Sequence, residues 1–84
     1  APANYDGGNY SVQVGAFKDY QNALRLSDQL KKTFGYSEIK SALVNGELFY
    51  RVHAGKYSSL GAAEDAEKSF VEHGFPGSFT ISLD

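Results

Sequence analysis

Residues 10–17 read Tyr-Ser-Val-Gln-Val-Gly-Ala-Phe, and residues 50–57 read Tyr-Arg-Val-His-Ala-Gly-Lys-Tyr, so one pattern occurs twice in the chain. In each copy, apolar and polar residues alternate up to a glycine, which is typical of a strand with one buried side. A helical pattern follows each copy, and Gly35-Tyr36 or Gly74-Phe75 then opens a second strand. The repetition predicts two similar halves that fold onto one another as one small domain.

The two helices are predicted from apolar residues at helical spacing. Asp19 and Ser59 precede them as N-caps, because their side chains can accept from free amides of the first turn. Gly35 and Gly74 end them, since glycine adopts the left-handed conformation at little cost. The residues expected to face inward are Ala23, Leu26, Leu30 and Phe34 in the first helix, and Ala63, Ala66 and Phe70 in the second.

Asn45-Gly46 predicts a tight hairpin with a two-residue type I′ turn. Val44 then faces Glu47, and facing residues share a side of the sheet. One side of this hairpin is mostly apolar and is assigned to the core, which supports the register. The core side comprises Ile39, Leu43, Leu48, Tyr50 and Val52, and the other side comprises Glu38, Lys40, Ala42, Phe49, Arg51 and His53.

Together these elements predict an α+β, ferredoxin-like βαββαβ fold: a four-stranded antiparallel sheet with two helices on one face. The first and third strands are its central neighbours. Gly15 and Gly55 are expected to end these two strands, and Tyr36 and Phe75 to plug the ends of the core. In the last strand, the apolar set Phe79, Ile81 and Leu83 is assigned to the core.

No helix covers the other face of this sheet. The alternation of the two central strands places on it Ser11, Gln13, Phe49, Arg51 and His53. An aromatic ring with an amide, a guanidinium and an imidazole suits a flat or grooved ligand site. On the residues alone, a solvated face with one isolated phenylalanine, or a dimer surface, remains open.

Composition restricts the class of protein. The chain has 84 residues, a net charge of −2 and no cysteine. These values fit one globular domain, and they argue against binding held mainly by nucleic-acid phosphates and against disulfide or zinc–thiolate sites. No apolar run approaches the roughly 18–20 residues of a membrane span. We interpret residues 1–8 as a linker remnant and 9–84 as the domain.

Enzyme and metal sites are not predicted, and no cofactor is expected. His53 and His73 are assigned to opposite sides of the fold, so they should not share a metal, and Ser58 and Ser59 resemble helix caps more than nucleophiles. RNA-binding RRM domains share the topology, but this chain lacks their basic-aromatic string on the third strand. A protein-interaction or RRM-like module that uses the same face is the alternative to a carbohydrate binder.

The paired strings at residues 10–17 and 50–57 resemble the SPOR family, the sporulation-related repeat of bacterial envelope proteins. The resemblance covers residues 9–83. It implies a non-catalytic domain that binds peptidoglycan, prefers glycan strands denuded of stem peptides, and targets a parent protein to septal or remodelled cell wall. The parent would be a division protein, a rare lipoprotein A-type lytic transglycosylase or an amidase, located in the periplasm or cell envelope. We expect a monomer.

The resemblance also implies site residues. The family's glutamine matches Gln13, its third-strand arginine matches Arg51, and the aromatic two residues earlier matches Phe49. Ala16 replaces a common serine, and Lys56 replaces the usual proline and would add a donor at the rim.

Chemistry assigns roles to these residues. A denuded glycan has a free lactyl carboxylate on each muramic residue, which Arg51 can bind in bidentate fashion. His53 would assist when protonated, Gln13 suits an acetamido group, and Phe49 can pack on a sugar face. Ser11 and Tyr57 complete the expected contacts. For Tyr57, which matches Phe17 in the first copy, packing in the turn is the first interpretation and a contact from the rim is the alternative.

Overall fold

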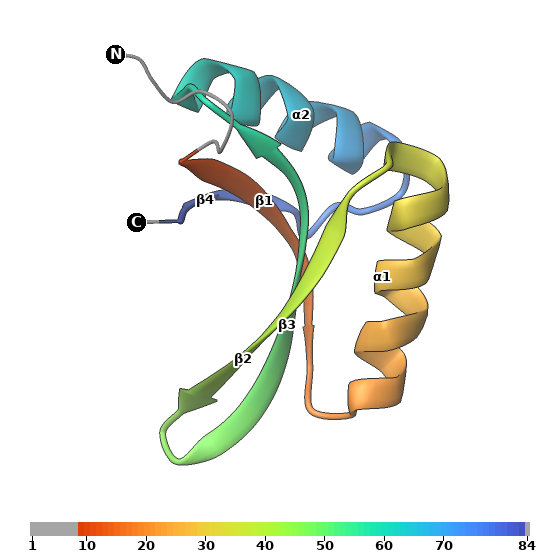
Figure 1. The fold of residues 1–84 in the computed structure, drawn as a ribbon, viewed down its shortest axis with the longest axis vertical. Helices are drawn as coiled ribbons and strands as arrows, with labels where there is room; N and C mark the ends of the chain where they lie inside the picture. The colour runs from red at the N-terminus through yellow and green to blue at the C-terminus, as the bar shows by residue number, and fades with distance from the viewer. Residues whose placement is uncertain (1–8, 84) are drawn as a thin grey trace.

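The computed structural model describes residues 9–83, and the predicted linker remnant lies outside this range. The elements run β1 (Tyr10–Phe17), α1 (Tyr20–Phe34), β2 (Ser37–Val44), β3 (Glu47–Tyr57), α2 (Leu60–Glu72) and β4 (Phe79–Ser82). The strands form one antiparallel sheet of order β2-β3-β1-β4, with the two helices packed on one face of it (Figure 1). The predicted α+β fold and its central strands are therefore confirmed.

The core lies between β1 and β3 and the two helices. Its most buried side chains include Val12, Val52, Leu30 and Phe70, which come from all four of these elements. The rings of Phe34 and Phe70 meet edge to face with centroids 4.5 Å apart, so the two helices contact each other through aromatic side chains. Neither helix in the described part of the chain is long and apolar enough to cross a membrane.

The helix ends follow the sequence prediction. The Asp19 side chain accepts from the Gln21 amide at 2.9 Å, and the Ser59 hydroxyl accepts from the Ala62 amide at 3.1 Å. Gly35 ends α1 with φ 92°. These caps fix where each helix begins and how it lies on the sheet.

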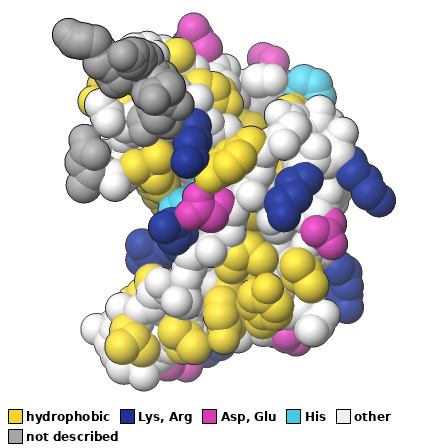
Figure 2. All heavy atoms as spheres, viewed as in Figure 1, with side chains coloured by type: hydrophobic (Ala, Val, Ile, Leu, Met, Phe, Trp, Pro, Cys, Tyr) yellow, Lys and Arg dark blue, Asp and Glu magenta, His cyan; other side chains and the backbone are white. Residues whose placement is uncertain are grey.

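The hairpin register is also confirmed: Val44 faces Glu47, and Asn45 and Gly46 have φ 53° and 82°, as a type I′ turn requires. Its outer half, however, is not part of the core. Leu43 and Leu48 are 74% and 46% exposed. Their assignment to the core was wrong because the hairpin extends beyond the helices, and hydrophobic side chains gather over this lower part of the molecule (Figures 1 and 2).

Gly15 and Gly55 do not end their strands, although the sequence predicted that they would. β1 shifts register between Gln13 and Gly15, and β1 and β3 shift again between Tyr10 and Val12. Each glycine therefore lies at a β-bulge, and the strand continues for two residues beyond it. The bulge in β1 changes the alternation, so that Phe17 packs against the core.

The side chains of β4 lie on the opposite faces of the sheet from those predicted. Phe79 faces Gln13, and Ile81 faces Ser11, so both lie on the sheet face away from the helices. Thr80 faces the helices instead, where its amide and hydroxyl donate to Glu67 Oε1 at 2.7 and 2.8 Å. The assignment of the apolar residues of β4 to the core was therefore wrong. The strand contacts α2 through the hydrogen bonds between Thr80 and Glu67 instead.

Candidate ligand-binding face of the sheet

We call the side of the sheet opposite the helices the open face. Residues that face one another across strands lie on the same side, so the register arranges its side chains in rows. The first row crosses all four strands, and the second lies beside it. The first row is Glu38, His53, Gln13 and Phe79; the second is Lys40, Arg51 and Ala16; Ala42 and Phe49 form the third.

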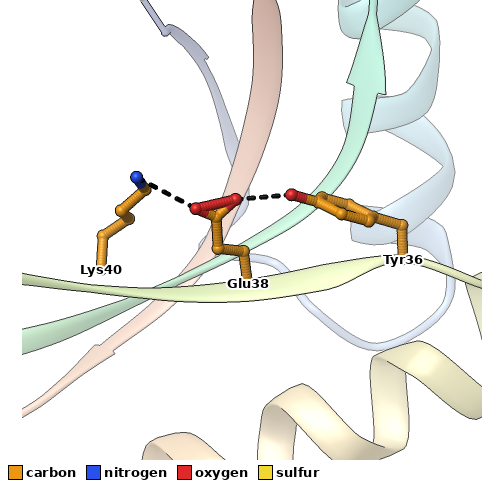
Figure 3. A network of polar contacts seen from close by, with 3 residues as sticks. All are labelled: Tyr36, Glu38 and Lys40. Carbon is orange, nitrogen blue, oxygen red and sulfur yellow. Dashed lines mark hydrogen bonds and ion pairs between the residues drawn. The ribbon is translucent and has the colours of Figure 1, made fainter. Parts of the chain in front are cut away.

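The Glu38 carboxylate contacts two side chains that lie close to it in sequence. It accepts a hydrogen bond from the Tyr36 hydroxyl and pairs with Lys40 Nζ at 3.0 Å (Figure 3). The hydrogen bond from Tyr36 and the contact with Lys40 hold the pKa of Glu38 below its ordinary value. Burial and the bond to Glu38 raise the pKa of Tyr36 to about 12.

Tyr36 was expected to plug the core, and this expectation was wrong. Its hydroxyl points to Glu38, on the side of β2 away from α1 (Figure 3). Lys56 Nζ lies 5.1 Å from the centroid of the Tyr36 ring, so the exposed Lys56 borders the same corner of the open face.

The second glutamate of this face is paired as well. Glu47 contacts Lys18 Nζ at 3.0 Å, and the same ammonium lies 5.8 Å from the centroid of the Phe49 ring. Within residues 9–83, the ion pairs are these two, and Arg51 takes part in neither. Arg51 is half-buried in the middle of the second row. It is therefore a cation without an internal carboxylate partner.

His53 lies on the same face as Arg51 but is more deeply buried. It is only 7% exposed, and neither ring nitrogen has a hydrogen-bond partner within the described residues. Burial lowers its pKa; Glu38 opposes this shift, while Lys40 and Arg51 add to it. The lowered pKa favours the neutral imidazole, whereas the role expected for His53 from the sequence requires its protonated form.

Two further predicted site residues make contacts within the protein. The Ser11 hydroxyl is buried and donates to the Ala54 and Gly55 carbonyl oxygens, at 3.1 and 2.7 Å. Tyr57 packs against the core, and burial raises the pKa of its hydroxyl. Both side chains support the bulge at Gly55, and a contact of either with a ligand stays a prediction.

Phe79 is the residue that the sequence reasoning missed. It is 48% exposed and ends the row that contains Gln13. The alternation of residues 78–83 fits either orientation of the strand, and the only sequence signal is the polar pair Thr80 and Glu67. No enclosed pocket occurs in the part of the chain that the structure describes. The rows of the open face form the candidate ligand-binding surface.

The model of the SPOR domain family matches residues 6–81. The chain belongs to the SPOR domain family. This SPOR domain is similar to the solution structure of the peptidoglycan binding domain of the B. subtilis cell wall lytic enzyme CwlC, with a TM-score of 0.68 and 26% identity over 100% of both chains. No curated protein matches the sequence.

Proposed function

We propose that this SPOR domain binds bacterial peptidoglycan on its open face, without catalysis, and prefers glycan strands that have lost their stem peptides. The observation that carries the proposal is the uncommitted Arg51 in the middle of that face. The family supports it, as does the likeness to a peptidoglycan binding domain.

The preference follows from charge. A denuded glycan has a free lactyl carboxylate on each muramic residue, whereas an intact strand has the same group locked in an amide. A guanidinium binds a carboxylate through two parallel hydrogen bonds, so removal of the peptide creates the group that Arg51 recognises. Because Lys40 and Lys18 already neutralise the two glutamates of the face, Arg51 is free to bind it.

The residues around Arg51 match the rest of the glycan. Gln13 offers both a donor and an acceptor for an acetamido group. Phe49 and Phe79, in the third and first rows, provide apolar surface on which sugar faces or acetyl methyl groups can pack. Lys56 adds a cation at the corner beside Tyr36. A monomeric domain of this kind would carry its parent protein to septal or remodelled wall in the cell envelope.

The test is binding to purified sacculi before and after amidase treatment. We expect enrichment on treated sacculi, and we expect Arg51→Ala to lose about 1.5–3 kcal/mol of binding free energy, roughly ten- to 150-fold in affinity. Arg51→Lys keeps the charge but loses the bidentate geometry, so it should recover only part of the loss.

Arg25 offers a matched control. It is an exposed arginine on α1 that contacts Asn22, and Arg25→Ala should bind as the wild type does. Full binding by Arg51→Ala would refute the proposed site. Equal binding to treated and untreated sacculi would contradict the preference for denuded glycan, and no binding to either would favour a protein partner.

A further inference from the structure

His53 is a buried polar side chain without a partner in the middle of the open face. Among the described residues, its two ring nitrogens are the buried side-chain polar atoms that make no hydrogen bond. Leaving such atoms unpaired is costly, and native proteins usually avoid it unless the group has a role or a partner is missing. The backbone at this point is well fixed, since the Ser37 hydroxyl donates to the His53 carbonyl oxygen at 3.0 Å.

The charges around His53 disfavour a proton on its ring. Glu38 faces it from β2, but this carboxylate is already held by Tyr36 and Lys40. Lys40 itself and Arg51, two residues away on β3, are cations on the same face. From β1 and β4, the same row brings only the uncharged Gln13 and Phe79. The imidazole therefore lacks a free counter-ion within residues 9–83.

A bound carboxylate would supply this counter-ion. Residues two apart on a strand have Cα atoms about 6.6 Å apart and side chains on the same face, so an anion on Arg51 acts on the His53 ring over a distance comparable to a Debye length of about 8–10 Å. A negative charge at this distance favours the imidazolium, and by linkage protonation of His53 must raise the affinity for the anion by the same factor. The lactyl carboxylate stays ionised above about pH 4.5, so it does not titrate in the same range.

We propose that His53 makes glycan recognition pH-dependent, so that the domain binds anionic, denuded glycan more tightly in mild acid than near neutral pH. The proposal rests on the proposed function, because it requires a carboxylate-bearing ligand on Arg51. It assigns His53 a role in specificity, since only a ligand with a negative charge gains from the proton.

The experiment measures the affinity for soluble glycan fragments from amidase-treated sacculi at about pH 7.5 and pH 5.5, at constant ionic strength. If binding raises the pKa of His53 by one unit, protonation of His53 raises the affinity about tenfold. We therefore expect the affinity of the wild type to be about three- to tenfold higher at about pH 5.5 than at about pH 7.5. His53→Gln, which cannot be protonated, should bind about equally at the two pH values. His73→Gln is the control, because His73 lies at the end of α2 and contacts Ser69.

Chitin oligosaccharides provide the matched ligand, since they have the acetamido groups but no lactyl carboxylate. Any binding of them should not tighten in acid. Unchanged or weaker wild-type binding at low pH, or the same tightening in His53→Gln, would overturn the inference. With either of these outcomes, binding of the wild type at pH 7.5 would still support the proposed function. Failure of the wild type to bind at either pH would overturn the proposed function and this inference with it.

A second measurement does not depend on the fold of a variant. Proton NMR of the wild-type imidazole signals gives the pKa of His53 with and without glycan. We expect the glycan to raise this pKa, by about half a unit or more, to match a three- to tenfold change in affinity. An unchanged or lowered pKa in the complex would contradict the proposal.

Discussion

At the scale of the residue, His53 couples the stability of the free domain to pH. Its pKa is lowered by burial from 6.5, so the unfolded chain takes up a proton before the folded chain does. The unfolded state then binds more protons, and the free energy of unfolding falls as pH decreases below about 6.5. Glu38 acts in the same direction at lower pH, because its pKa lies below the ordinary 4.5 when folded.

We therefore predict that urea denaturation gives a lower free energy of unfolding at about pH 5.5 than at about pH 7, and that His53→Gln reduces this difference. His73→Gln should leave the difference as in the wild type, since His73 is exposed at the end of α2. An equal decline in the wild type and in His53→Gln would mean that other groups cause it.

The sequence placed Gln13, Phe49, Arg51 and His53 on one face, because strict alternation holds along the middle of β3 and at the start of β1. It did not reveal that His53 is buried and neutral. Burial of a side chain on a sheet face depends on its neighbours in the row, and those of His53 come from the three other strands of the sheet. A local pattern contains no such information.

At the scale of the element, the bulge in β3 determines where its last side chains point. Gly55 has φ 74°, a conformation that costs a residue with a Cβ about 1–2 kcal/mol. A Cβ at this position would also collide with the Tyr57 ring, which packs against the core. The glycine thus allows the chain to pass under the tyrosine ring.

We predict that Gly55→Ala lowers the free energy of unfolding by about 1–3 kcal/mol in chemical denaturation. Gly61→Ala is the matched control: a Cβ there meets no atom within 4 Å, and alanine is favoured over glycine in a helix, so this variant should be at least as stable as the wild type. If Gly55→Ala were as stable as the wild type, the bulge would not depend on this glycine.

The bulges also explain which predictions about the elements failed. The glycine pattern was correctly found twice, but a glycine after an alternating run is equally consistent with a strand end and with a bulge. In β4, alternation alone does not say which side is buried. The contact of Thr80 with Glu67 decides it, and this contact joins β4 to a residue of α2 that the strand pattern alone does not identify.

At the scale of the whole molecule, the internal repetition was the most informative feature of the sequence. Each repeat supplies one central strand, so the two similar strings become neighbours, β1 and β3, in the middle of the sheet. Both helices then cover the same side, and the opposite side of the sheet has no helix over it (Figure 1). The fold could be predicted because the turn at Asn45-Gly46 and the helix caps agree with this repetition.

The most direct test of the account maps the glycan on the folded domain by amide chemical shifts during titration with denuded glycan fragments. We predict that the largest changes fall on the rows of the open face, at Gln13, Arg51, His53 and Phe79, and that amides in the middle of α1 and α2 change little. Changes centred instead on the helices, or on the exposed Leu43 and Leu48 of the hairpin, would contradict the claim that the uncovered face of the sheet binds peptidoglycan.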